Sequence, residues 1–118
     1  MAEKTIEGRI GEAWHLHRQG KNQEALKAFE DVLGMAPTHV DAHYGIGLVY
    51  RSLGENNKAI EAFKKALTLA EEAYKASRRV SEAEGVYTND LRTNEDDRYM
   101  ILTRMIKQRL ESLGESIE

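Results

Sequence analysis

Four histidines are the residues of this 118-residue sequence whose spacing first suggests chemistry. His39 and His43 are four residues apart, the separation that places two imidazoles on one helical face, as a pair of metal ligands requires. They straddle the predicted start of a helix, however, and a metal site needs three or four converging ligands. We therefore interpret this pair as packed or half-exposed histidines, with His43 in a core packing position. His15 and His17 are two residues apart, so they should point to different faces.

An acidic triplet, Glu95, Asp96 and Asp97, could in principle bind a cation. It lies where we predict the first turn of a helix, and acidic side chains there stabilise the positive end of the helix dipole. The sequence contains no cysteine, no glycine-rich nucleotide loop, no nucleophile elbow and no HExxH signature. We expect a protein that is not an enzyme and that has no metal and no cofactor.

The composition and net charge of the sequence indicate which classes of binding partner to expect. Charged residues make up 31% of the sequence and apolar residues 41%, with one proline, which favours a soluble and mostly helical protein. The formal net charge of -3 lacks the basic excess typical of nucleic-acid binding. No segment approaches the roughly 20 apolar residues that span a bilayer, and the N-terminus lacks the apolar stretch of a signal peptide. We expect a cytoplasmic protein that binds neither nucleic acid nor membrane.

An internal repeat predicts the elements that position these residues. Residues 24–33, EALKAFEDVL, align without a gap on residues 58–67, KAIEAFKKAL, at an offset of 34 residues. This is the period of a helix-turn-helix repeat. Gly20 recurs as Gly54, so both copies should turn at glycine.

The first copy predicts two helices. The first covers residues 6–19 with Thr5 as its N-cap, and the second covers residues 23–35 with Asn22 as its cap. Pro37 ends the second helix, because proline cannot continue a helical hydrogen-bond ladder.

The second copy predicts a longer hairpin. Its first helix should be capped by Thr38 and closed by Gly54, and Asn56 should open the next. The first copy stops at proline, but the matching residue here is Glu71, so the fourth helix should extend to about residue 83, before a stop at Gly85.

The rest of the chain predicts a loop over residues 84–94 and a last helix over residues 95–113, with Asn94 as cap and Gly114 as stop. The apolar stripe of this helix consists of Tyr99, Leu102, Ile106, Leu110 and Leu113, widened by Ile101 and Met105.

The repeat resembles the tetratricopeptide repeat, whose signature is Trp, Leu-Gly, Tyr, Ala, Phe and Pro at fixed spacing. The second copy matches through His43 in the tryptophan slot, Ile46, Gly47, Tyr50, Ala59 and Phe63. The first copy matches through Ala13, Leu16, Ala25, Phe29 and Pro37, and departs at Arg9 and Glu12, as a terminal repeat does.

The resemblance covers about residues 6–73 and implies an all-α superhelix of two hairpins, repeat one over 6–39 and repeat two over 40–73. Small residues at Ala13, Ala25, Gly47 and Ala59 should let paired helices approach closely, and Phe29 and Phe63 should fill the space between successive hairpins. Two repeats build little core by themselves. We therefore expect the last helix to cap the second hairpin, in place of the next repeat's first helix.

Tetratricopeptide domains typically bind peptides or helices in a concave groove, so the resemblance implies a protein or peptide partner here. The predicted partner-binding residues are Ile10, Trp14, His17, Tyr44, Leu48 and Arg51. They form an apolar floor with a cationic rim, and tryptophan, tyrosine and arginine are enriched in binding hot spots. The family's carboxylate clamp for chaperone C-termini would find Ile10, Trp14 and Gly45 in its slots, so we do not expect that ligand.

One alternative stays open at this point. The apolar residues of the groove could be covered by the last helix folding back or by a second copy of the chain. The protein would then be a homo-oligomerising scaffold, for example a homodimer, that uses the groove or residues 74–80 of the extended helix.

Overall fold

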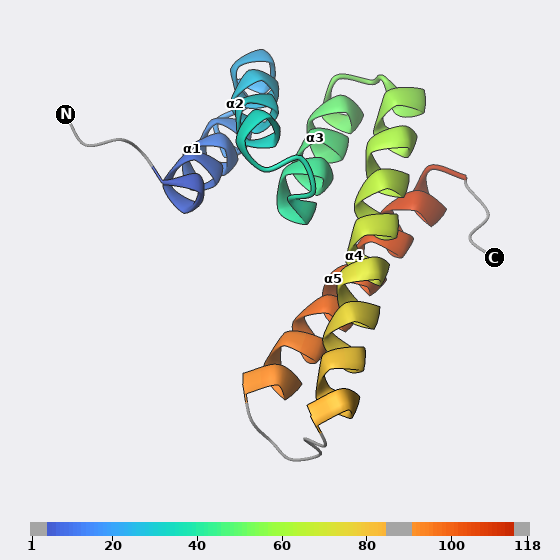
Figure 1. Ribbon diagram of the computed structural model, residues 1–118. Helices are drawn as coiled ribbons and strands as arrows, with labels where there is room; N and C mark the ends of the chain where they lie inside the picture. Colours follow the sequence, from blue (N-terminus) through green and yellow to red (C-terminus); the bar gives the residue numbers. More distant parts are fainter. Residues whose placement is uncertain (1–4, 85–90, 115–118) are drawn as a thin grey trace.

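The computed structural model describes the backbone of residues 5–84 and 91–114, and the side chains of residues 5–76 and 100–114. Within these ranges the chain forms five α-helices and no β-strand. The helices are α1 (Ile6–Arg18), α2 (Asn22–Met35), α3 (Val40–Ser52), α4 (Asn56–Glu84) and α5 (Leu91–Ser112). Figure 1 shows α1 to α4 side by side in chain order, with α4 extending beyond the others and α5 running back along it. The predicted all-α class is confirmed.

Both hairpins turn at glycine in the same way. Gly20 and Gly54 have φ angles of +77° and +78°, in the left-handed region that glycine adopts without steric cost. In each turn the residue after the glycine donates its N–H to a carbonyl five positions earlier in the chain: Lys21 to Leu16 at 3.0 Å in the first hairpin, and Glu55 to Tyr50 at 2.9 Å in the second. These bonds satisfy a carbonyl at the end of each first helix. The sequence repeat is therefore also a repeat of backbone hydrogen bonds.

One of the two caps predicted in the first repeat is confirmed. The Thr5 hydroxyl oxygen accepts a hydrogen bond from the Gly8 N–H at 3.0 Å. The prediction for Asn22 is wrong, because Asn22 is the first residue of α2 and Lys21 is the cap, without a side-chain bond. The Lys21 carbonyl already accepts the first helical bond, from Ala25 at 2.9 Å, so the helix begins one residue earlier than predicted.

The cap predicted for α3 is also wrong. His39 is the N-cap, and its Nδ1 accepts a hydrogen bond from the Ala42 N–H at 3.3 Å. Thr38 lies inside a turn that the His39 N–H closes by donating to the Ala36 carbonyl at 3.0 Å. The turn after Pro37 therefore moves the cap position to the histidine.

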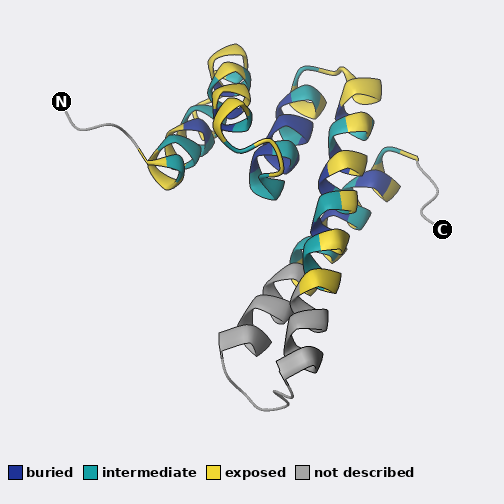
Figure 2. Cartoon of the chain, viewed as in Figure 1, coloured by how far each residue is buried: buried dark blue, intermediate teal, exposed yellow. Residues whose placement is uncertain are grey.

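The core consists of two adjoining clusters of buried side chains. The first joins α1, α2 and α3 through Ala13, Ala25, Phe29, Val32, Ala42, Ile46 and Val49. The second joins α3, α4 and α5 through Tyr44, Ala59, Phe63, Ala66, Ala70, Ile106 and Leu110. Figure 2 shows that α3, which belongs to both, is buried along much of its length.

Two phenylalanine rings lie directly against glycines of α3. A Cβ atom added to Gly45 would come within 2.4 Å of the Phe29 ring, and one added to Gly47 within 2.5 Å of the Phe63 ring. Phe29 therefore fills the space between the two hairpins, as predicted. Phe63 contacts Gly47 within its own hairpin, and it is also buried in the second cluster with Ile106 and Leu110 of α5, the helix that follows this hairpin. Gly45 is glycine because the Phe29 ring occupies the place of its side chain.

Helix α5 seals the second hairpin. Ile106 and Leu110 are buried in the second cluster, and Leu102 and Leu113 pack against it from the edge. The predicted stripe is thus confirmed at these four positions, whereas the side chain of Tyr99 lies outside the described residues. Gly114, with φ of +85°, follows the helix as predicted.

The boundaries and width of the last helix differ from the prediction. The loop expected over residues 84–94 falls partly outside the described residues, as does Gly85, but α4 reaches Glu84 and α5 begins at Leu91. Asn94 lies inside α5 and is not its cap, since the leucine and arginine before it are good helix formers. Ile101 and Met105 do not widen the buried stripe, because 57% and 40% of their surfaces are exposed.

Candidate functional site

The six predicted partner-binding residues come from α1 and α3, and we call the surface that carries them the candidate face. Trp14 of α1 is half-buried and contacts both core clusters. Its ring meets Phe29 edge-on, with centroids 5.0 Å apart and planes at 80°, and lies 6.3 Å from the Tyr44 ring. These contacts hold the indole in one orientation while part of its surface stays accessible.

Tyr44 is covered within the molecule. Only 5% of its surface is exposed, and its hydroxyl oxygen accepts a hydrogen bond of 3.2 Å from Nε of Arg109 in α5. The sequence left open whether the last helix or a second copy of the chain covers the groove residues. For Tyr44 the last helix provides the cover. Tyr44 anchors α5 to α3 and offers little surface to a partner.

The other four residues of the candidate face remain partly or fully exposed. Ile10 packs at the edge of the first cluster and Leu48 at the edge of the second. His17 is half-buried with its ring centroid 6.1 Å from that of Trp14, and its Nδ1 is buried without a hydrogen-bond partner among the described residues. Arg51 is exposed at the end of α3. The accessible part of the face is therefore apolar in the middle, with basic groups at one end.

Three residues of α5 adjoin this face and were not predicted as part of it. Ile101, Met105 and Arg109 follow one another at intervals of four, which places them on one side of the helix. The Arg109 bond to Tyr44 shows that this side lies next to α3. Spacing in the sequence did not separate these residues from the buried stripe, because Ile101 and Met105 fit the helical period as well as Ile106 does.

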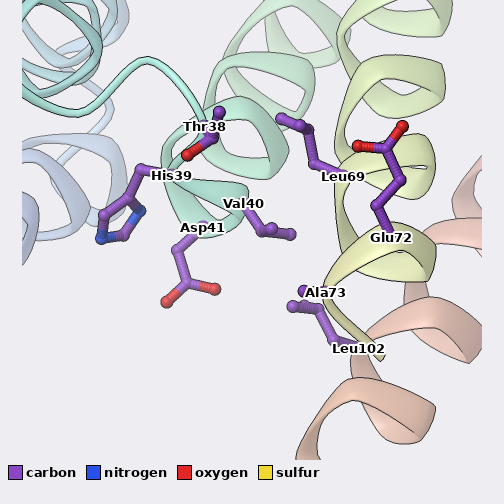
Figure 3. A pocket seen from close by; sticks show the side chains of 8 residues that line it. All are labelled: Thr38, His39, Val40, Asp41, Leu69, Glu72, Ala73 and Leu102. Atoms are coloured by element: carbon purple, nitrogen blue, oxygen red, sulfur yellow. The ribbon is translucent and has the colours of Figure 1, made fainter. Parts of the chain in front are cut away.

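A hollow of about 490 Å³ lies at the start of α3, between it, α4 and α5 (Figure 3). It is lined by Thr38, His39, Val40, Asp41, Leu69, Glu72, Ala73 and Leu102. Asp41 is three residues before Tyr44 and so lies on nearly the same side of α3. The hollow therefore continues the candidate face, and its acidic groups stand at the end opposite to Arg51.

The histidines at the start of α3 have separate partners. Nδ1 of His39 accepts from the helix backbone, whereas Nε2 of His43 donates to the Pro37 carbonyl at 2.9 Å. Among the residues that the structure describes, no three histidine, aspartate or glutamate side chains gather in a group that could hold a metal ion. No described helix combines the length and apolar character needed to cross a bilayer.

Two sequence profiles, both described as tetratricopeptide repeat, match this chain, one over residues 10–76 and the other over residues 69–99. The second match extends the similarity beyond residue 73, where the motif recognised in the sequence ended.

Among curated proteins, the aspartyl/asparaginyl beta-hydroxylase of Mus musculus is 31% identical over 71 residues, which cover 60% of this chain and 10% of that protein. Two crystal structures of MamA resemble the fold, each with a TM-score of 0.55. They are 22% and 21% identical and cover 95% and 97% of this chain, which spans 62% and 61% of theirs. The matched part of this chain thus spans a tenth of the hydroxylase and about six tenths of the MamA chains. At these identities the MamA likeness concerns the fold.

Proposed function

Since this chain belongs to the tetratricopeptide repeat family, a family of protein-interaction modules, we propose that it binds a segment of a partner protein on the candidate face. The residues that carry this role are the accessible ones, Ile10, Trp14, His17, Leu48 and Arg51. Tyr44 supports them from beneath, as the residue that fixes α5 beside α3.

The observation that carries the proposal is the state of Trp14. Its ring is held edge-on by the fully buried Phe29, and it still presents part of its surface between the two clusters. A large aromatic side chain that is already ordered loses little conformational entropy on binding, which is the property of a hot-spot residue. Leu48 on α3 and the exposed Met105 on α5 extend the same apolar strip.

The charges at the two ends of the face favour a partner with opposite charges at its own two ends. Arg51 and His17 stand at one end, and Asp41 and Glu72 line the hollow at the other. Asp41 and Arg51 are ten residues apart on α3, or about 15 Å along the helix axis. A segment of about five extended residues spans this distance. The preferred ligand has apolar residues in its middle, an acidic residue at the Arg51 end and a basic or neutral residue at the hollow.

Catalysis is not part of the proposed role. The similarity to the hydroxylase covers a tenth of that protein, within the residues that match the tetratricopeptide profiles. The function proposed for this chain is that of a binding module.

Selection from a phage-displayed library of random 12-residue peptides tests the proposal directly. Peptides enriched on the wild-type protein should carry apolar residues flanked by aspartate or glutamate on one side. Leu48→Glu, which introduces a charge into the apolar strip, should weaken their binding at least about tenfold, since an unpaired charge at an interface costs several kcal/mol.

The matched control is Lys27→Glu, a charge change at an exposed position of α2 that the proposal leaves outside the face. It should leave the affinity unchanged. Enriched peptides that bind Leu48→Glu and wild type equally well would place the binding site elsewhere.

A further inference from the structure

A second surface lies on the opposite side of α5. A hollow of about 630 Å³ runs between α4 and α5, and we call it the α4–α5 groove. It is lined by Glu71, Tyr74, Lys75, Met100, Thr103, Arg104, Lys107, Gln108 and Glu111. Lys107 follows the buried Ile106 by one residue and Met105 precedes it, so the two are rotated about 100° in opposite directions. The groove and the candidate face therefore occupy different sides of the molecule.

No helix among the described residues covers this groove. Helix α3 has α2 on one side and α4 on the other, and six of its residues are buried. Helix α5 packs on α4, and of its described side chains, residues 100–112, only Ile106 and Leu110 are buried. Met100 keeps 48% of its surface exposed and Tyr74 is half-buried beside it.

Another tetratricopeptide helix does not suit this face. Helices α2 and α4 approach α3 closely because their phenylalanine rings rest on Gly45 and Gly47. Residues 91–112 contain neither glycine nor alanine, and the groove side of α5 carries Arg104 and Lys107 instead. Whatever binds in the α4–α5 groove must therefore contact long, flexible side chains. This is typical of a contact between two molecules, which is less closely packed than neighbouring helices of a repeat.

Charges are ordered along the groove. On α4, which runs away from the repeats, Glu71 precedes Lys75 by one turn, and on α5, which runs back, Lys107 precedes Glu111 by one turn. On both helices the acidic residue is thus nearer to the repeats, and the basic residue is nearer to the end of the groove that lies away from them. Arg104 adds a further basic residue toward that end. Among the described residues, none of these five side chains makes a hydrogen bond or an ion pair.

We propose that the α4–α5 groove is the interface with a second copy of this chain, packed antiparallel about a two-fold axis. Such an axis brings the acidic end of one groove onto the basic end of the other, so each copy supplies the charges that its partner needs. Tyr74 and Met100 lie at the basic end of each groove, so they then pack against the acidic end of the partner's groove. The assembly would present two candidate faces, and it does not depend on what those faces bind.

Paired charge reversals test this arrangement by sedimentation velocity over a range of concentrations. The wild type should reach twice the monomer mass. The acidic variant Lys75→Glu/Lys107→Glu and the basic variant Glu71→Lys/Glu111→Lys should each dissociate at least tenfold more readily. An equimolar mixture of the two variants should recover the dimer, because opposite charges then face each other across the axis.

The double reversal Lys27→Glu/Glu30→Lys on α2 serves as the control and should dimerise like the wild type. Circular dichroism should show the same helix content for every variant, since all these positions are surface positions. A wild type that stays monomeric up to about 1 mM, a pair of variants that dimerise as well as the wild type, or a mixture that fails to recover the dimer would overturn the proposal. Binding of selected peptides to the candidate face should survive all of these substitutions.

Discussion

Replacing Gly45 with alanine tests how closely the two hairpins pack. The added Cβ would lie 2.4, 2.5 and 2.8 Å from three atoms of the Phe29 ring, whereas carbon atoms pack best at about 3.5–4.0 Å. Phe29 is fully buried, so its ring has no open space to enter. Either α3 moves about 1 Å away from α2, or the ring leaves its rotamer, and both changes disturb the first core cluster.

The expected loss of stability follows from two opposing terms. Overpacking of this kind costs about 1–3 kcal/mol, and contact with three ring atoms places this site near the upper value. Alanine is favoured over glycine inside a helix by about 1 kcal/mol. The free energy of unfolding should therefore fall by about 2 kcal/mol. In urea, where chains of this size lose about 1–3 kcal/mol per molar denaturant, the midpoint should fall by about 1 M.

Gly11→Ala is the matched control: apart from the nearby backbone of α1 itself, no atom of the described residues lies within 4 Å of a Cβ at that position. It should raise the free energy of unfolding by about 0.5–1 kcal/mol through helix propensity alone. Urea titration followed by helical circular dichroism measures both variants. A Gly45→Ala protein as stable as the wild type would refute the close packing of α2 on α3.

Three further predictions concern single contacts, all measured by urea unfolding. Trp14→Ala should reduce the free energy of unfolding by about 2 kcal/mol, because the indole bridges both clusters but is only half-buried; an unchanged value would mean that it does not contribute to the core. His39→Ala should cost about 0.5–1 kcal/mol through loss of the α3 cap, while His39→Asn should restore it, and equal values for the two would contradict the cap. Arg109→Ala and Tyr44→Phe should each cost about 1 kcal/mol, and their double mutant about the same; full additivity would show that the two side chains are not coupled.

The repeated part of the fold was predictable because its signals are local. The offset of 34 residues marks both glycine turns, and the apolar spacing around Phe29 and Phe63 marks the buried sides of α2 and α4. The cap of a helix also depends on which backbone carbonyl accepts the first helical hydrogen bond after a turn, and residue spacing does not show this. For that reason the caps at Asn22 and Thr38 were predicted wrongly.

The face that α5 presents to the core was only partly predictable. Apolar residues occur at 100, 101, 102, 105 and 106, so more than one stripe fits the helical period. In the structure, Ile106 and Leu110 are the residues that pack against Ala70 and its neighbours on α4. Ile101 and Met105 remain exposed. The bond between Arg109 and Tyr44 joins residues 65 apart in sequence. No spacing rule predicts it, and it decides which part of the candidate face is accessible.

The central claim is that a partner segment contacts the candidate face, and quenching of Trp14 fluorescence tests it most directly. Trp14 is the single tryptophan of the chain, so its emission reports on this face alone. At saturation with a selected peptide that contains no tryptophan, we predict a shift of the emission to shorter wavelength and at least about a twofold fall in the acrylamide quenching constant, since a hot-spot side chain is enclosed on binding. An emission maximum and a quenching constant that stay the same when the peptide is fully bound would contradict the account.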